Sequence, residues 1–132
     1  MKKVVLFLLL SCIIQKITAQ QLTGLWYSSD SSRIYEIKSA GPEQWKVIIH
    51  SSVRKNDKVG YEVIPQLGFN KTRNRFEGYI YSTETDQPVF ARISFCKTNS
   101  NEIKLKLDRM FLFDANLKWT RLNNNHITVS SE

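Results

Sequence analysis

The sequence predicts an all-β fold, a small antiparallel up-and-down β-barrel of about eight strands, and three observations support this prediction. Turn-forming clusters recur about every eight to twelve residues, a spacing typical of antiparallel barrels and sandwiches. Between the turns, apolar and polar residues alternate, most regularly over 103–108. Tryptophan motifs stand at both ends, Gly24-Leu25-Trp26 and Lys118-Trp119-Thr120-Arg121, as expected where the first strand pairs with the last and closes the sheet.

In the first half of the chain, four strands are expected between turn-forming residues, over 23–28, 33–38, 45–53 and 60–64. Asp30-Ser31-Ser32 turns the chain after the first strand, and Ser39-Ala40-Gly41-Pro42 ends the second. Trp45, Val47 and Ile49 share one face of the third. Pro65 has no amide hydrogen to donate, so we expect it to limit the fourth strand to an edge or a bend.

In the second half, the expected strands cover 75–82, 88–97, 103–108 and 117–122. The cleanest alternation places Ile103, Leu105 and Leu107 inward. An eight-stranded barrel has an interior that is either filled by side chains or able to hold one small ligand. Large inward candidates that would fill it are Trp26, Trp45, Phe76, Phe90 or Phe95, Leu107 and Trp119.

The first 19 residues predict a cleaved signal peptide. Met1-Lys2-Lys3 is positively charged, 4–14 is an apolar segment too short to span a bilayer, and Ile17-Thr18-Ala19 fits a cleavage site. We therefore expect export to a periplasmic or extracellular location. An alternative is a lipid anchor at Cys12, because Leu9-Leu10-Ser11-Cys12 loosely resembles a lipoprotein signal, although Leu10 fits that pattern poorly.

Cleavage after Ala19 would leave one barrel domain at 20–122 and a flexible polar tail at 123–132. Losing Lys2, Lys3 and Lys16 lowers the formal net charge from +7 to +4, which permits anionic partners without requiring them. No further segment is apolar enough to predict a transmembrane span. Cys96 would be the only remaining cysteine, either a small buried hydrophobe or a thiol for an intermolecular bridge.

The terminal tryptophan motifs resemble the calycin group, which includes lipocalins, fatty-acid-binding proteins and avidins. In that group a Gly-x-Trp on the first strand packs against an arginine near the last strand. Gly24-Leu25-Trp26 and Trp119-Thr120-Arg121 match these two motifs. The resemblance implies a calycin-like barrel.

A closer resemblance covers nearly the whole mature chain, and it is to the small secreted bacterial family catalogued as domain of unknown function 2147. Besides the terminal motifs, the matching segments are Tyr35-Glu36-Ile37, Phe76-Glu77-Gly78-Tyr79-Ile80-Tyr81 and Ile103-Lys104-Leu105-Lys106-Leu107. The chain departs from the family at Phe90, where a tyrosine is usual, and at 108–113, which lacks the usual glycines. The resemblance implies a fold and no particular activity.

The sequence indicates two sets of candidate site residues. Gly24, Trp26, Trp119 and Arg121 are expected to close the barrel, with the Arg121 guanidinium over the Trp26 ring. The candidate ligand-binding residues are Tyr79, Tyr81, Arg109, Met110, Phe111 and Phe113. The apolar run at 110–113 would either plug one barrel mouth or form a rim or contact patch, and the two tyrosines would face either outward or into the interior.

Catalysis, a metal site, a cofactor and nucleic-acid binding are not expected. The chain has two histidines, His50 and His126, no ligand set at metal-binding spacing and no nucleophile elbow. No nucleic-acid-reading motif accompanies the scattered basic residues Arg54, Lys55, Lys58, Lys71, Arg73, Arg75, Lys104 and Lys106, which we expect to be a solvated surface. The sequence thus favours non-enzymatic binding of a small, partly apolar ligand. The alternative is an envelope-structural or protein-interaction module with a filled core, and the oligomeric state is left open.

Overall fold

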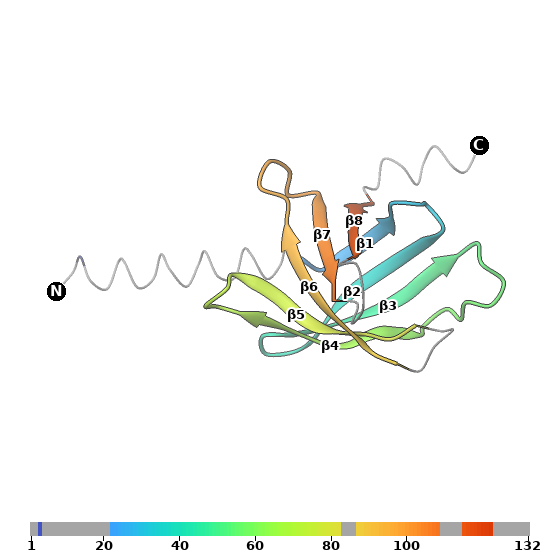
Figure 1. Ribbon diagram of the computed structural model, residues 1–132, viewed down its shortest axis with the longest axis horizontal. Coiled ribbons are helices and arrows are strands. Elements are labelled where there is room, and N and C mark those ends of the chain that lie inside the picture. The colour runs from blue at the N-terminus through green and yellow to red at the C-terminus, as the bar shows by residue number, and fades with distance from the viewer. Residues whose placement is uncertain (1–2, 4–21, 83–86, 109–114, 123–132) are drawn as a thin grey trace.

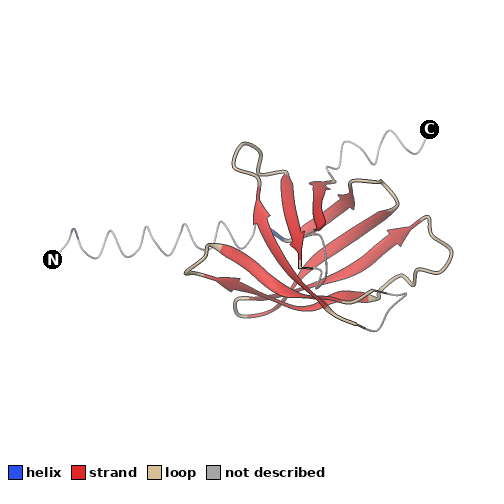
Figure 2. Ribbon diagram, in the orientation of Figure 1, coloured by secondary structure: helices blue, strands red, loops and turns tan. Residues whose placement is uncertain are grey.

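The computed structural model describes residues 3, 22–82, 87–108 and 115–122. They form eight strands: β1 (Gly24–Ser28), β2 (Arg33–Gly41), β3 (Gln44–Ser52), β4 (Glu62–Asn70), β5 (Arg75–Ile80), β6 (Val89–Phe95), β7 (Glu102–Leu107) and β8 (Ala115–Arg121). Each strand pairs antiparallel with the next, and β1 also pairs with β8, so the sheet closes into a barrel (Figure 1, Figure 2). The predicted fold class is confirmed. The predicted leader, apart from Lys3, and the tail at 123–132 lie outside the described residues.

β2 is longer than the sequence predicts. The expectation that Ser39-Ala40-Gly41-Pro42 ends this strand is wrong, because β2 continues to Gly41 and pairs there with Gln44 of β3. The reversal needs only Pro42 and Glu43. Positive φ angles of 133° at Gly41 and 56° at Glu43 allow the chain to turn in so few residues.

β4 also continues past the point where Pro65 was expected to stop it. Val47 pairs with Ile64 and Trp45 pairs with Leu67, so one residue of β3 opposes two residues of β4, Pro65 and Gln66. This is a β-bulge, where the ladder is already interrupted and a missing amide hydrogen is tolerated. The strand therefore extends to Asn70, and its second half pairs with β5.

The interior is filled by large apolar side chains. Trp26, Trp119 and the predicted inward residues Val47, Ile49, Ile103 and Leu105 are at most 1% exposed. Phe76 is 2% exposed and contacts Trp45, Phe69 and Phe95 with ring centroids 4.9 to 6.3 Å apart. Of the two alternatives on β6, Phe95 packs against the core, whereas Phe90 contacts the exposed ring of Tyr79. The described part of the barrel therefore has a packed core.

The up-and-down order places alternate connections at opposite ends of the barrel. The β1–β2 turn and the β3–β4 connection share one end, here called the β3–β4 end. The β2–β3, β4–β5 and β6–β7 connections share the other, the β2–β3 end.

Candidate functional site

The residues predicted to close the barrel meet where β1 pairs with β8. Arg121 pairs with Trp26 across the two strands, and its guanidinium lies 4.3 Å from the centre of the Trp26 ring. Its Nη1 donates to the carbonyl of Thr23 at 3.0 Å, and Nε1 of Trp26 donates to the carbonyl of Leu22 at 3.0 Å. Burial lowers the pKa of Arg121. We call Gly24, Trp26 and Arg121 the clasp. Its contacts join the first strand to the last, which is a structural role.

Gly24 leaves room for the Arg121 guanidinium. We therefore expect alanine to reduce stability more at Gly24 than at Gly41. Gly24 and Gly41 have nearly equal φ angles, 135° and 133°, but a Cβ on Gly24 would lie 3.0 Å from Nη1 of Arg121, whereas a Cβ on Gly41 would meet nothing within 4 Å. Both alanine variants carry the backbone strain, about 1–3 kcal/mol. We expect Gly24→Ala to be less stable than Gly41→Ala by about 1 kcal/mol in urea unfolding, because only it disturbs the cation–π contact. Equal losses would contradict this role for Gly24.

Trp119 is the fourth residue predicted to close the barrel, and it lies inside it. It is 1% exposed and stacks on Tyr35 with ring centroids 4.2 Å apart. Trp119 pairs with Ser28 of β1 and Ile103 of β7, so it sits at the strand junction that closes the sheet.

The candidate ligand-binding residues do not form one described site. Tyr79 is 53% exposed and stacks edge-to-face on Phe90 with ring centroids 5.5 Å apart, which settles the open question in favour of the outward orientation for this residue. Tyr81 follows β5 and is half-buried; its amide donates to the carbonyl of Val63 at 2.7 Å. Arg109, Met110, Phe111 and Phe113 lie outside the described residues.

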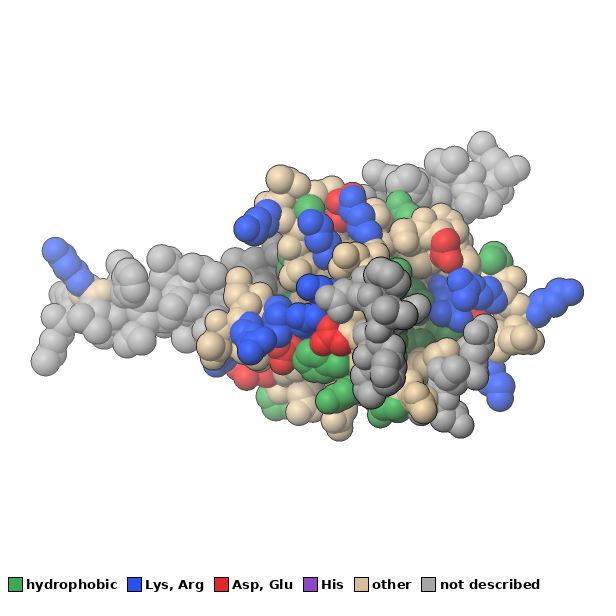
Figure 3. All heavy atoms as spheres, viewed as in Figure 1, with side chains coloured by type: hydrophobic (Ala, Val, Ile, Leu, Met, Phe, Trp, Pro, Cys, Tyr) green, Lys and Arg blue, Asp and Glu red, His purple; other side chains and the backbone are tan. Residues whose placement is uncertain are grey.

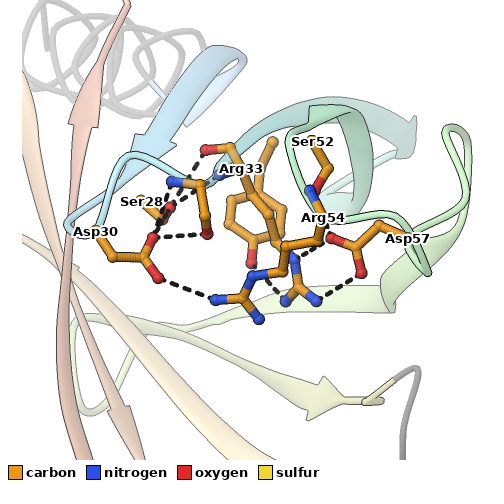
Figure 4. A network of polar contacts seen from close by, with 8 residues as sticks. Ser28, Asp30, Arg33, Ser52, Arg54 and Asp57 are labelled. Carbon is orange, nitrogen blue, oxygen red and sulfur yellow. Dashed lines mark hydrogen bonds and ion pairs between the residues drawn. The ribbon is translucent and has the colours of Figure 1, made fainter.

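A polar network that sequence reasoning missed ties the β1–β2 turn to the β3–β4 connection (Figure 4). Its centre is the ion pair of Arg33 with Asp57, in which Nε and Nη2 donate to the two carboxylate oxygens at 2.6 and 2.8 Å. The Ser52 hydroxyl donates to the same carboxylate at 2.6 Å. The side chains of Arg33 and Asp57 are 18% and 3% exposed, so this pair is largely removed from water. Its partners are 24 residues apart in the chain, and no local spacing signals their contact.

The network also sets the protonation of its two carboxylates. The hydrogen bonds from Arg33, and then that from Ser52, lower the pKa of Asp57 from 3.8 to about 2. Asp30 accepts hydrogen bonds from Ser28, Ser32 and Arg54, which hold the pKa of that carboxyl well below its usual range. Both groups are therefore carboxylates at neutral pH, and the network is an ionic tie between two connections.

The outer face of β5–β8 carries a groove of about 590 Å³. We call it the basic groove, because five of its lining residues are cations: Arg75, Arg92, Lys104, Lys106 and Lys118. The remaining lining residues are Ile93, Ser94, Leu105, Asn116 and Leu117. Figure 3 shows Lys and Arg side chains gathered over this side of the barrel.

The strand register places cations of the basic groove directly opposite one another. Arg92 pairs with Lys106 across β6 and β7, and Lys104 pairs with Lys118 across β7 and β8. Like charges in directly opposite positions destabilise a sheet. The two pairs lie next to each other, so the four cations form a cluster whose mutual repulsion opposes folding.

Carboxylates offset part of this charge from outside the groove lining. Glu77 accepts from Arg75 at 2.8 Å, Glu102 pairs with Lys118 at 2.9 Å, and Asp108 pairs with Arg92. The bond from Arg75 lowers the pKa of Glu77, and the bond to Glu102 raises the pKa of Lys118. Nε of Arg92 is nevertheless buried without a hydrogen-bond partner among the described residues.

The basic residues that the sequence singled out lie in three separate places on the barrel. Arg75, Lys104 and Lys106 line the basic groove, whereas Arg54, Lys55 and Lys58 lie in the β3–β4 connection at one end of the barrel. Lys71 and Arg73 lie in the β4–β5 turn at the other end. The groove was missed because Arg92 and Lys118 belong to separate segments that only the barrel brings together.

The structure also places Cys96 and His50, two further residues considered in the sequence analysis. Cys96 is half-buried rather than buried, and a hydrogen bond with the Thr98 hydroxyl lowers its pKa. Its position after the last residue of β6, in a connection, explains why it is not part of the core. His50 is on the surface, with Nδ1 3.6 Å from the carboxylate of Glu36.

The described ranges contain neither a metal-binding cluster nor a helix that could span a membrane. Three or more histidine, cysteine or acidic residues do not come together there as a metal site. Those ranges also include no helix with the length and apolar character needed to cross a membrane.

The fold and the clasp define a small, closed, antiparallel eight-stranded barrel. Comparison with known proteins adds no family to this description, since no family model, curated protein or solved structure matches the chain.

Proposed function

We propose that this protein is a non-enzymatic binding protein and that its ligand, a small and partly apolar anion, binds in the basic groove. The observation that carries the proposal is the presence of two adjacent cross-strand pairs of like charge, Arg92 with Lys106 and Lys104 with Lys118. An anion bound between them would replace repulsion with charge-assisted hydrogen bonds. The interior also favours an external site, because apolar side chains occupy the described core.

The dimensions and lining of the basic groove suit such a ligand. Its volume of about 590 Å³ lies within the range of small-molecule sites, about 300–1,000 Å³. The aliphatic stems of the lysines and arginines provide apolar surface between the charged groups. Arg92 offers a planar guanidinium that matches a carboxylate or phosphate group.

A titration with phenyl phosphate, a small anion with an apolar ring, tests the proposal. We expect amide NMR shifts confined to β5–β8 and a Kd below about 1 mM at low salt. Lys104→Gln should weaken binding about tenfold, since it removes a charged hydrogen-bond donor. The same variant should keep or raise the thermal midpoint, because it relieves the repulsion with Lys118.

Lys97→Gln is the matched control, because Lys97 is an exposed lysine on the β6–β7 connection, outside the groove lining. It should bind phenyl phosphate like the wild type. Inorganic phosphate and benzyl alcohol separate the charged from the apolar contribution, and each should bind more weakly than phenyl phosphate. Shifts spread over the whole barrel, or an unchanged Kd for Lys104→Gln, would overturn the proposal.

A second candidate function is an envelope-structural or protein-interaction module. The packed interior around Trp26, Phe76 and Trp119 supports it, because such a barrel needs no ligand for stability. Native mass spectrometry of protein purified from its own host separates the two candidates. A stoichiometric small mass that is lost on unfolding supports a ligand, and a bare dimer supports the interaction module.

We also propose an exported location and a family for this protein. The charged, apolar and small-residue segments of 1–19 support export to the periplasm or the outside of the cell, with a lipid anchor at Cys12 as the less favoured route. The clasp geometry supports a place in the calycin group, whereas the proposed membership of the family catalogued as domain of unknown function 2147 rests on the sequence segments alone. The intact mass of the exported protein tests the first point, because cleavage after Ala19 and lipidation give different masses.

A further inference from the structure

The β3–β4 connection presents two aliphatic side chains to solvent. Val53 and Val59 are 81% and 73% exposed, and both belong to the segment between β3 and β4. Figure 1 shows this connection projecting from one end of the barrel. Single exposed aliphatic residues are common on proteins, but two on one projecting loop form a candidate contact surface. We call residues 53–59 the tip.

The tip is held in place by hydrogen bonds on both sides. The amide of Val53 donates to the carbonyl of Ser32 at 3.0 Å, and the amide of Gly60 donates to the carbonyl of Ile49 at 2.8 Å. Within the tip, the amide of Asp57 donates to the carbonyl of Arg54 at 3.3 Å. The ion pair with Arg33 then anchors the Asp57 side chain to β2. The exposure of the two valines is therefore part of a defined loop conformation.

The charge that the tip shows to solvent is positive. Its only carboxylate, Asp57, is 3% exposed and neutralised by Arg33. Arg54, Lys55 and Lys58 are exposed, and Arg54 pairs with Asp30 of the neighbouring turn at 2.9 Å. Within the described part of the chain, neither Lys55 nor Lys58 forms an ion pair. The tip thus combines two exposed valines with two lysines that lack an acidic partner there.

We infer that the tip docks onto an anionic phospholipid surface, with Val53 and Val59 among the headgroups and Lys55 and Lys58 against the lipid phosphates. Burial of aliphatic side chains at the headgroup boundary and attraction of lysines to anionic lipids act together in such binding. The composition favours lipid over a protein partner, because the centres of protein interfaces are enriched in aromatic residues and arginine and depleted in lysine. The proposal is independent of the basic groove, which lies on the outer face of other strands.

Co-sedimentation with lipid vesicles tests the inference. Protein recovered after export from cells expressing the full chain, with leader removal checked by intact mass, is mixed with vesicles of phosphatidylglycerol and phosphatidylcholine in equal parts. We expect binding to these vesicles and much weaker binding to pure phosphatidylcholine, with attraction falling as salt rises. Lys55→Gln/Lys58→Gln should lower the partition coefficient about 25-fold, since each lysine near an anionic surface contributes roughly a factor of five.

Val53→Ser/Val59→Ser should lower the same partition coefficient about tenfold, because the valines no longer bury apolar surface. Matched controls are Tyr79→Ser, which removes an exposed apolar side chain on β5, and Lys97→Gln at the opposite end of the barrel. Both controls should bind like the wild type, and circular dichroism should show every variant to be folded at the temperature of the binding experiment. Equal binding to both vesicle types, or wild-type binding by either double variant, would overturn the inference.

Discussion

Replacing Trp26 by alanine is expected to lower the free energy of unfolding by about 4 kcal/mol, within the range for removal of a large buried aromatic side chain. Trp26 is fully buried, donates a hydrogen bond to Leu22 and lies under the Arg121 guanidinium. In a barrel of this size the thermal midpoint should fall by roughly 20 °C. Urea unfolding followed by circular dichroism measures the change.

A double-mutant cycle separates the cation–π contact from the loss of volume. Trp26→Phe keeps an aromatic ring in the core, and Arg121→Met keeps an unbranched side chain beside it. We expect a coupling energy of about 1 kcal/mol between the two positions. Additive effects would show that the clasp stabilises the barrel by packing alone, and a Trp26→Ala loss below about 1 kcal/mol would contradict its place in the core.

Asp57→Ala is expected to cost about 3 kcal/mol, because it leaves the Arg33 guanidinium largely buried without its partner. The matched control is Arg54→Ala, which removes the exposed pair with Asp30, leaves the hydrogen bonds from Ser28 and Ser32 to Asp30 in place, and should cost less than about 1 kcal/mol. Urea midpoints of the two variants measure the difference. Similar losses would show that burial of the Arg33–Asp57 pair does not govern its contribution.

The same ion pair predicts a pH dependence with a definite sign. The folded-state pKa of Asp57, about 2, lies below its ordinary value of 3.8. A lowered pKa stabilises the fold above the unfolded value, so this contribution is complete above about pH 4 and is lost as the pH falls toward 2. The stability difference between the wild type and Asp57→Asn should therefore shrink over this interval. A difference that stays constant from pH 5 to pH 2 would contradict the lowered pKa.

Much of the fold was predictable because strands and their inward faces depend on neighbours along the chain. The alternation of Ile103, Leu105 and Leu107 predicts a strand with one buried face, and the structure buries all three. The paired motifs at the chain ends predicted the clasp, and Arg121 does lie over Trp26. The predictions of strand ends were wrong where strand pairing overrides the local preference of a residue. Pro65 stays within β4 because the register supplies a bulge there.

The candidate sites were much less predictable, since they combine side chains from distant segments. Arg33 and Asp57 are 24 residues apart, and their contact depends on how the β3–β4 connection folds over the start of β2. The basic groove depends on register, because a shift by one residue would move its cations to the inner face. The sequence alone was compatible with either face for Tyr79. The pairing of β5 with β6 places its side chain on the outer face, beside Phe90.

The sequence by itself determined a closed β-barrel with a clasp between its ends, and it left open whether side chains fill the interior. Period-two alternation and the placement of tryptophan, glycine and arginine are local patterns that a single chain reveals directly. Only the tertiary structure decided which charges meet: Arg92 with Lys106, Lys104 with Lys118, and Arg33 with Asp57. The physical reason is that cross-strand neighbours are set by the register of the closed sheet, and that register is a property of all eight strands together.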